Sequence, residues 1–321
     1  MDSRTGIAAI VVTYNRRDML TGTVDALLSQ TVSPDAIIVV DNASTDGTAD
    51  LFTPGSSLDR PQVRYIRLEE NLGGAGGFKR GISVAHQDGF AWCWVMDDDV
   101  VPDDDALEQL IASNDHLEGH GVRPSFLASH VTNPDGELLN VPVVSSHLSA
   151  NGYPDWSEFL PRSLVRIEIA TFVSLLIPMW AVDEVGLPIA NFFMWGDDSE
   201  YTKRLTSFVG PAFLCGTSHV THLRSISAPV STVFETDEGR VRNHRRATRN
   251  DFISTAYYGG ALPSLRLLAR HARDVARIAV RRDPLAVPKI KSICTGVLDF
   301  ALGRFDLEDL AKLNRNERKN Y

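Results

Sequence analysis

Runs of apolar residues alternate with helical patterns along the N-terminal third of the chain. Three continuous apolar runs, Ile7–Thr13, Ala36–Val40 and Phe90–Met96, are typical of strands that are buried on both faces of a sheet. Between the first two runs, apolar residues recur at helical spacing over Arg17–Gln30, and Val63–Arg67 alternates as a further strand. Strands that alternate with helices predict an α/β protein, built from βαβ units around a mostly parallel sheet flanked by helices.

The later part of the chain has fewer strand signals. Glu168–Ile177 and Phe213–His222 are candidate strands, and Asp198–Phe208 has a helical pattern that the preceding acids would cap. After these segments the strand signals stop. We therefore predict an N-terminal sheet domain, residues 1–225, and a helical C-terminal region, residues 226–321.

The chain of 321 residues has a formal net charge of −9, and this charge is unevenly distributed. From Arg240 to Tyr321 there are 18 Lys and Arg against 8 Asp and Glu, whereas the other residues include 14 basic and 33 acidic side chains. The basic region is therefore expected to face an anionic partner. We expect a phospholipid surface and not nucleic acid, because no nucleic-acid-binding motif accompanies the charge.

Cysteine spacing and hydrophobicity indicate a cytoplasmic protein that does not span a membrane. The three cysteines, Cys93, Cys215 and Cys294, are too widely spaced for a metal-binding motif or a disulfide framework. No stretch approaches the roughly 18 consecutive apolar residues of a membrane-spanning helix. The first residues also lack the basic start and apolar core of a signal peptide.

Polar residues gather where the predicted strands end. Thr13–Arg16, Asp41–Asp46 and Asp97–Asp99 each follow an apolar run. Ligands of parallel α/β sheets bind beyond the carboxyl ends of the strands, so these clusters are expected to converge on one site. The first and third acids of Asp97–Asp99 could hold a hard divalent cation that bridges diphosphate oxygens, whereas Asp103–Asp105 more simply begin a helix.

Two histidines at the end of the strand Phe213–His222 could complete such a metal site. Residues i and i+3 lie on opposite faces of a strand, so only one of the two can point towards the carboxylates. We favour His222 over His219 as the ligand.

The segment Asn71–Gly81 combines a glycine-rich turn with a helix that is expected to start near Phe78. Glycines allow backbone N–H groups to approach phosphate or ribose closely, and a helix N-terminus favours anions. The segment could also be a structural turn only, or a dinucleotide-binding fingerprint, although that motif belongs after the first strand and this segment follows the third. Asp41 could accept a hydrogen bond from a nucleotide base or ribose, or belong to a plain turn.

Two further acids, Asp197 and Asp198, follow an aromatic run and precede a helix in WGDDSEY (Trp195–Tyr201). A carboxylate in apolar surroundings could have a raised pKa and act as a general base. Either residue could also cap the helix, and the two roles are compatible.

In their order and spacing, these motifs resemble the inverting glycosyltransferases of family 2, which have the GT-A fold. The resemblance covers roughly residues 7–225 and extends more loosely to Arg249-Asn250 and Arg281–Pro284. Within the family, the motifs are most similar to the actinobacterial galactofuranosyltransferases of cell-wall galactan synthesis, notably the initiating enzyme. The matching segments are IVVTYNR (Ile10–Arg16), VVDNASTDGT (Val39–Thr48), NLGGAGGFKRG (Asn71–Gly81), MDDDV (Met96–Val100) and FFMWGDDSEYTKRL (Phe192–Leu205).

The resemblance implies that residues 1–225 form the catalytic domain and bind a UDP-sugar donor together with a metal ion. The implied residues are Thr13, Arg16 and Asp41 for the uridine, Asn71, Gly73 and Gly74 for the ribose and diphosphate, and Asp97, Asp99 and His222 for Mn²⁺ or Mg²⁺, with Asp97 serving both donor and ion.

The resemblance also implies a base and an acceptor platform. Asp198 would deprotonate the acceptor hydroxyl, and Asp197 stays an alternative because the relatives vary between Asp and Glu at the position of Asp198. Trp195 would form part of the platform for the sugar or the acceptor. The implied reaction is a single in-line displacement at the anomeric carbon.

We therefore expect the transfer of galactofuranose from UDP-galactofuranose to a polyprenyl-diphosphate-linked glycan in cell-wall polysaccharide synthesis. A rhamnosyltransferase that uses dTDP-rhamnose is a close alternative. A nicotinamide-dependent oxidoreductase built around the glycine run, and a catalytically inactive nucleotide-sugar binder, are alternatives from other classes.

The basic C-terminal region contains a stripe of arginines at helical spacing: Arg266, Arg270, Arg273, Arg277 and Arg281. A basic amphipathic helix can lie in an anionic membrane interface, and a polyprenyl-linked acceptor would place the protein at the inner face of the plasma membrane. The alternative is a helix that packs on the catalytic domain with its arginines in solvent. A second amphipathic stretch, Ile290–Leu302, would pack beside this helix or form a contact in a homo-oligomer.

Overall fold

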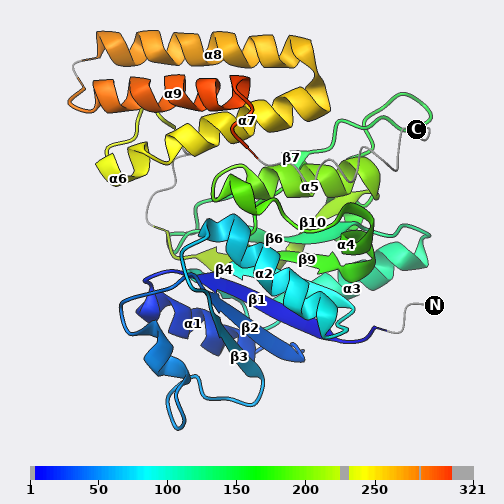
Figure 1. Ribbon diagram of the computed structural model, residues 1–321. Helices are drawn as coiled ribbons and strands as arrows, with labels where there is room; N and C mark the ends of the chain where they lie inside the picture. The colour runs from blue at the N-terminus through cyan, green and yellow to red at the C-terminus, as the bar shows by residue number, and fades with distance from the viewer. Residues whose placement is uncertain (1–3, 225–230, 282, 306–321) are drawn as a thin grey trace. The chain divides into compact units, whose positions relative to one another are not determined.

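The computed structural model of the protein describes residues 4–224, 231–281 and 283–305 (Figure 1). Of the regions predicted above, residues 226–230 and 306–321 and the second arginine of the Arg281–Pro284 motif lie outside the described residues. Contacts within the chain divide it into two units. The first comprises Met1–Pro188 and Tyr201–Ser227, and the second comprises Ile189–Glu200 and Ala228–Tyr321. The segment with the Asp197-Asp198 pair therefore groups with the C-terminal helices and not with the sheet.

The first unit contains the sheet, and its strands and helices alternate through the first part of the chain. Its strands are β1 (Ile7–Thr13), β2 (Ala36–Asp41), β3 (Val63–Arg67), β4 (Trp92–Asp97), β5 (Val100–Pro102), β6 (Phe126–Thr132), β7 (Val143–Val144), β8 (Leu164–Ile169), β9 (Leu175–Pro178) and β10 (Ala212–His222). Its helices are α1 (Arg17–Leu28), α2 (Gly73–Gln87), α3 (Ala106–Gly119), α4 (Met179–Val185) and most of α5 (Asp197–Phe208), and short 3-10 turns lie at Thr48–Phe52 and Leu160–Arg162.

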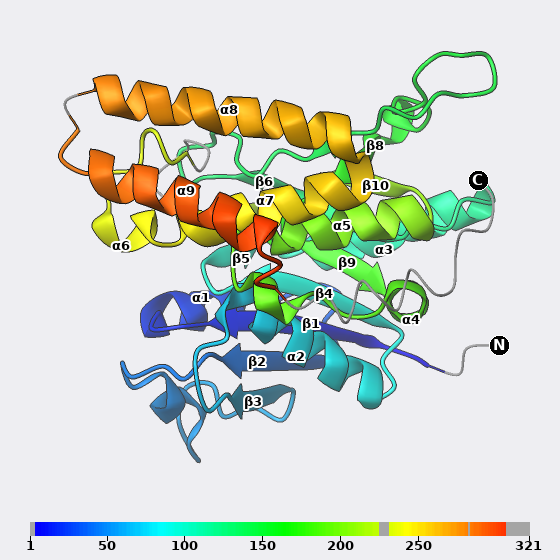
Figure 2. The same ribbon diagram turned by 45° about the horizontal axis from the view of Figure 1, so that its top comes forward.

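Among the described residues, the ten strands form one sheet in the order β3-β2-β1-β4-β9-β6-β10-β8-β7, and β5 pairs with β10 (Figure 2). The strands β3, β2, β1 and β4 run parallel, as predicted from their alternation with helices. The remainder is mixed, because β9 runs antiparallel to β4 and β6, while β10 is parallel to β6 and antiparallel to β8. The predicted α/β class is confirmed, and the sheet as a whole is mixed.

The segment Glu168–Ile177 was predicted as one strand, and this prediction is wrong, because β8 ends at Ile169 and β9 begins at Leu175. The turn between them is fixed by Thr202 on α5, whose hydroxyl contacts both the N–H and the carbonyl of Ala170 at 3.1 Å. The break lets β8 pair with β10 and lets β9 pair with β4 and β6.

Alternate residues of the parallel strands face different helices. Val11 and Val39 belong to the buried core that α1 and α3 cover. Ile10 and Val40 point to the other face, where they lie against Gly81 of α2. Both faces of β1 and β2 are therefore buried, as their continuous apolar runs predict.

The second unit contains four helices within the described residues: α6 (Glu238–Val241), α7 (His244–Gly259), α8 (Ala261–Val280) and α9 (Ala286–Ala301), together with the 3-10 turn Ala190–Phe192. Figures 1 and 2 show α7, α8 and α9 side by side. Phe252 of α7 stacks on His271 of α8 and on Phe300 of α9, with ring centroids 5.6 and 5.3 Å apart. The predicted second amphipathic stretch thus lies in α9, which packs against both α7 and α8.

Candidate active site

The strand register brings three predicted site residues to one edge of the sheet. Thr13 pairs with Asp41 across β1 and β2, and Val12 pairs with Asp97 across β1 and β4. The carboxyl ends of these parallel strands therefore present Thr13, Asp41 and Asp97 next to one another, as the positions of the polar clusters predict.

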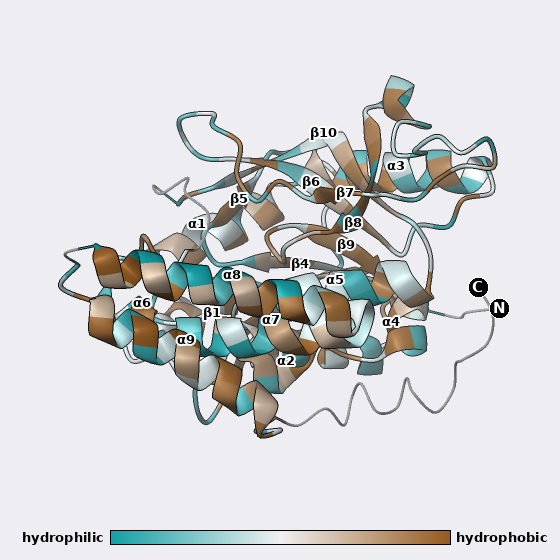
Figure 3. Ribbon diagram, turned by 90° about the horizontal axis from the view of Figure 1, so that it is seen from above, coloured by the Kyte–Doolittle hydropathy of each residue, from teal (hydrophilic) through white to brown (hydrophobic). Residues whose placement is uncertain are grey.

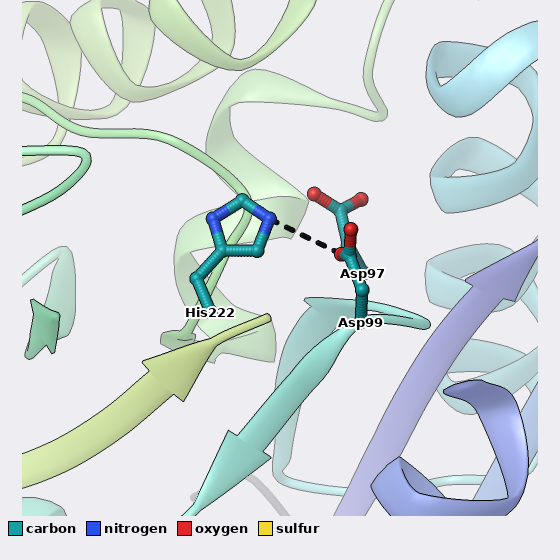
Figure 4. A group of neighbouring side chains, drawn as sticks. All are labelled: Asp97, Asp99 and His222. Carbon is teal, nitrogen blue, oxygen red and sulfur yellow. Dashed lines mark ion pairs between the residues drawn. The ribbon is translucent and has the colours of Figure 1, made fainter. Parts of the chain in front are cut away.

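Asp97, Asp99 and His222 form a cluster beyond this edge (Figure 4). Each residue offers one ligand atom, and these atoms all lie within 4.8 Å of one another. Asp99 Oδ1 lies 3.1 Å from His222 Nε2. Two backbone features hold the pair in place: His222 is registered with Val100 across β10 and β5, and the N–H of Leu223 donates to the carbonyl of Asp99 at 2.8 Å.

The imidazole of His222 is oriented by a residue that the sequence pattern did not identify. His222 Nδ1 lies 3.0 Å from Asn140 Oδ1, which can only accept a hydrogen bond, so Nδ1 carries the proton and donates. Nε2 then faces Asp99 Oδ1: it donates a hydrogen bond to this oxygen when the imidazole carries a second proton, and it offers its lone pair to a metal ion when the imidazole is neutral, which is how outer partners hold metal-ligating histidines. The alternative ligand His219 lies instead against His130, with ring centroids 5.2 Å apart.

The buried carboxylates of Asp98 and Asp99 make this end of the sheet strongly acidic. Burial raises the pKa of Asp98 to about 6. Burial also acts to raise the pKa of Asp99, but the nearby His222 and the Arg16 guanidinium outweigh it and hold that pKa below its ordinary value. Arg16 forms ion pairs with both carboxylates.

These residues fit a divalent cation. Within the described part of the chain, Asp99 Oδ1 is a buried oxygen with no other hydrogen-bond partner, and it faces Nε2 of His222 at 3.1 Å. Two acceptor atoms that face each other in a buried site repel unless a proton or a metal ion lies between them. Carboxylates are ligands that suit Mg²⁺ and Mn²⁺, and imidazole is a common ligand of transition metals.

The predicted uridine-binding acid Asp41 is fully buried, and both of its oxygens bind other protein groups. Oδ1 accepts a hydrogen bond from the N–H of Ser44 at 2.9 Å, and Oδ2 accepts one from the hydroxyl of Tyr65 at 2.5 Å. Burial and the Asp41 carboxylate raise the pKa of Tyr65, so that Tyr65 keeps the proton it donates. Asp41 therefore shapes the loop after β2.

The glycine-rich segment forms the first turns of α2, and the prediction that this helix starts near Phe78 is wrong. The helix starts at Gly73, which has a φ of 72° and donates its N–H to the side chain of Asn71 at 2.8 Å. Further on, a Cβ at Gly77 would lie 2.4 Å from Val12, and one at Gly81 would lie 2.3 Å from Ile10.

Two roles therefore combine in this segment. The later glycines let α2 pack closely on β1, whereas Gly73 and Gly74 supply N–H groups of the helix N-terminus. Asn42, which follows β2, connects the two elements: its Oδ1 accepts from the N–H of Leu72 and its Nδ2 donates to the carbonyl of Gly73, both at 3.2 Å.

In the second unit, an irregular loop leads to the Asp197-Asp198 pair. Phe193, Trp195 and Gly196 all have positive φ, at 66°, 59° and 95°. The fully buried side chain of Asn250 on α7 holds this loop: its Nδ2 lies 3.0 Å from the carbonyl of Phe192, 2.9 Å from that of Trp195 and 3.4 Å from that of Met194. Left-handed backbone at non-glycine residues persists only where the surroundings enforce it.

Arg249 completes this arrangement. Its guanidinium donates to Asn250 Oδ1 at 2.9 and 3.1 Å and to the carbonyl of Asn191 at 2.6 Å. Because Asn250 Oδ1 is occupied by Arg249, its Nδ2 is turned towards the loop carbonyls. The only sequence signal of these two residues was their place in the looser family resemblance, and nothing in the sequence indicated what they contact.

The acids after this loop have raised pKa values. Burial, together with the neighbouring charges of Asp198 and Glu200, raises the pKa of Asp197, and burial raises that of Asp198. Asp197 is buried, whereas Asp198 is partly exposed and Oδ1 accepts from the N–H of Ser199. Trp195 packs against His244, with ring centroids 4.9 Å apart.

The known proteins that this chain resembles are glycosyltransferases. The family model described as glycosyl transferase family 2 matches residues 8–133. The chain is similar to the galactofuranosyltransferase GlfT1 of Mycolicibacterium smegmatis, with 30% identity over 224 residues that cover 67% of this chain and 70% of that protein.

Two solved structures have a similar fold. One is the mannosyltransferase PcManGT of Pyrobaculum calidifontis in complex with GDP-Man and Mn²⁺, with a TM-score of 0.54, 16% identity and coverage of 97% of this chain and 79% of that one. The other is TarS of S. aureus in complex with UDP, with a TM-score of 0.53, 14% identity and coverage of 95% of both chains. At these identities the likeness concerns the fold alone.

Proposed function

The chain belongs to glycosyltransferase family 2 and has the GT-A fold, and from this premise we propose that it transfers galactofuranose from UDP-galactofuranose to a polyprenyl-diphosphate-linked glycan. The process it would serve is cell-wall polysaccharide synthesis, and the reaction would invert the anomeric carbon. The similarity to GlfT1 supports the sugar, and the cluster of Asp97, Asp99 and His222 is the observation that carries the catalytic part of the proposal.

In this proposal Asp97, Asp99 and His222 hold Mn²⁺ or Mg²⁺. When bound, the cation offsets negative charge on the diphosphate of the donor. Asn140 keeps His222 Nδ1 protonated, which leaves Nε2 for the metal. The Asp99 carboxylate stays ionised over the whole neutral range, because its pKa is held below the ordinary value.

The donor nucleotide lies beyond the ends of β1 and β2. Thr13 and Arg16 bind the uridine, and Asp41 acts with them by fixing the N–H of Ser44. Asn71, Gly73 and Gly74 face the ribose and diphosphate, where the start of α2 favours negative charge.

Asp198 is the base that removes the proton from the acceptor hydroxyl. Its partial exposure favours it over the buried Asp197, because a general base has to approach the hydroxyl within hydrogen-bonding distance. The raised pKa of Asp198 makes it a stronger base than an ordinary aspartate once it is ionised. Trp195 provides an aromatic surface for the sugar or the acceptor.

The protein would act at a membrane surface through α8. Within the described residues no helix combines the length and apolar character needed to cross a bilayer. On α8, Leu267, His271 and Ile278 are buried, while Leu262 and Leu265 are exposed. Arginines lie among these leucines in the exposed surface, and Figure 3 shows brown and teal segments along the same helix. Exposed leucines beside arginines suit the interface of an anionic membrane.

The test is a transfer assay with a synthetic lipid-linked disaccharide, Mn²⁺ and either UDP-galactofuranose or dTDP-rhamnose, with the product weighed by mass spectrometry. We expect a mass gain of one hexose with UDP-galactofuranose and none with dTDP-rhamnose. Asp99→Asn should lose the product, while Asp135→Asn, on an exposed turn, should keep it. Transfer from dTDP-rhamnose alone would replace the proposed donor, and NADH binding with no transfer would favour the oxidoreductase alternative.

A further inference from the structure

The second unit contains a cavity of about 880 Å³ that lies among α6, α7 and α9. Its lining is unusually basic: six side chains are cationic, against two acids, Glu238 and Asp299. The cationic residues are Arg242, Arg245, Arg246, Arg249, Lys291 and Arg304. The proposed transfer reaction gives this cavity no role.

One of the two acids is already neutralised by the cavity's own arginines. Asp299 accepts hydrogen bonds from Arg245 Nε and Nη2 at 2.5 and 2.9 Å, and Arg304 Nη1 lies 3.7 Å from it. These contacts hold the pKa of Asp299 below its ordinary value, so it stays ionised, and its negative charge also acts on Arg249.

Two other arginines at the cavity are in contact with neutral groups. Arg246 donates to Asn243 Oδ1 at 3.0 Å and lies 4.0 Å from the Phe193 ring centroid. Arg249 donates to Asn250 Oδ1 and to a backbone carbonyl. Burial and the neighbouring Arg245 lower the pKa of Arg246. Burial, Arg246 and Arg245 also lower the pKa of Arg249, and Asp299 offsets only part of that effect. The positive charge of the cavity is therefore under-compensated.

Four of these arginines lie close together in the sequence, and their mutual repulsion lowers the stability of this segment. Arg242 lies three and four residues before Arg245 and Arg246, and Arg249 lies three and four residues after Arg246 and Arg245, so these side chains are neighbours where the chain enters and forms α7. Like charges at this spacing destabilise a helix. An anion among them would remove that repulsion, and the planar guanidinium groups match two oxygens of a phosphate at once.

The cavity also has an apolar side. Val241, Val287 and Pro288 contribute to the lining beside the arginines. A free inorganic anion would leave these apolar side chains unused, whereas a phosphate attached to a hydrocarbon chain would contact both kinds of surface.

We infer that this cavity binds the phosphate group of a lipid, with the arginines on the phosphate oxygens and the valines and proline against the start of the chain. A lipid diphosphate fits the excess of cations better than a single phosphodiester does. Identification of this ligand with the glycan acceptor rests on the proposed function, whereas the binding of a lipid phosphate does not.

Calorimetric titration of the whole protein tests this inference, with inorganic pyrophosphate and geranyl diphosphate as probes and without divalent metal. Geranyl diphosphate should bind more tightly than pyrophosphate, because its chain reaches the apolar side. The double variant Arg242→Gln/Arg246→Gln should weaken both by about tenfold or more, the loss expected for charge-assisted contacts. A matched variant, Arg266→Gln/Arg273→Gln, removes the same charge from the exposed surface of α8 and should stay within about twofold, because exposed charges are screened.

Two further variants and a vesicle assay separate binding in this cavity from binding elsewhere. Asp99→Asn should leave these affinities unchanged, since a diphosphate bound at the donor site without metal would bind more tightly once the Asp99 charge is removed. Lys291→Gln offers a milder variant if the double one unfolds. Flotation with phosphatidylglycerol vesicles separates the sources: loss of vesicle binding in Arg242→Gln/Arg246→Gln, without loss of geranyl diphosphate, would assign the site to a phospholipid headgroup. Unchanged binding of every probe in this variant and in Lys291→Gln would overturn the inference, whether or not the protein transfers galactofuranose.

Discussion

Replacement of Asn250 by alanine should reduce transfer strongly while leaving the fold and the donor site intact. The Asn250 amide donates to the carbonyls of Phe192 and Trp195 at 3.0 and 2.9 Å, in a fully buried position. Each carbonyl left unsatisfied costs about 1–3 kcal/mol, so the loss of these two hydrogen bonds should cost the loop about 2–6 kcal/mol.

The response of the loop to this loss of free energy determines whether the transfer rate falls. Phe193 and Trp195 already hold left-handed backbone, which costs of order 1–3 kcal/mol for each residue. Without Asn250 the loop can relax to ordinary backbone and displace the Asp197-Asp198 pair. Since about 1.4 kcal/mol corresponds to a factor of ten in rate, we expect transfer to fall by roughly tenfold or more.

The assay compares three substitutions by initial transfer rate, melting temperature and affinity for UDP with Mn²⁺. Asn250→Asp keeps the size of the side chain and its ability to accept from Arg249, but it removes the donated hydrogens, so it should be as impaired as Asn250→Ala. Asn191→Ala removes an exposed side chain from the same loop and keeps the carbonyl that Arg249 binds, so it should be nearly neutral. Affinity for UDP should be unchanged in all three. If both Asn250 variants transfer at the normal rate while melting several degrees lower, Asn250 only stabilises the fold, and the reasoning is refuted.

Three further predictions concern the metal, the base and the packing of the sheet. Asp99→Asn should weaken Mn²⁺-dependent UDP binding by about 100-fold or more, since loss of even an outer partner costs about 10- to 100-fold; calorimetry in which this variant binds UDP and Mn²⁺ normally would exclude Asp99 as a ligand. The pKa of Asp198 is raised, and its ionised form is the base in the proposed reaction, so the transfer rate should decline at a higher pH than the ordinary aspartate pKa of about 3.9. A pH–rate profile that is flat down to about pH 4 would contradict this. Gly81→Ala should lower the free energy of unfolding by about 1–3 kcal/mol, because the new methyl group would lie 2.3 Å from Ile10. The control is Gly22→Ala in α1, where nothing lies within 4 Å of the added Cβ. In urea titrations this variant should be as stable as the original protein or more stable by about 0.5–1 kcal/mol. Equal midpoints for the two variants would refute the packing argument.

Local pattern was enough to find the parallel half of the sheet and the acids at its edge. A strand buried on both faces has to be apolar at every position, so β1, β2 and β4 are visible as continuous runs. The chain direction then places Asp41 and Asp97 where those strands end. The linear order of the motifs also identified the family, because those motifs follow one another in the same way in its members.

The tertiary structure decided which distant residues complete each site. Asp99 meets His222 because β5 pairs with β10, and the imidazole is turned by Asn140, which lies on an irregular segment with no periodic signal. Asn250 reaches the loop before Asp197 from a helix much later in the chain. A single buried amide leaves no mark on hydrophobic periodicity, and the pairing of strands far apart in sequence depends on the whole sheet. The sequence therefore determined the elements and the chemistry at their ends, whereas the fold determined the partners that orient that chemistry.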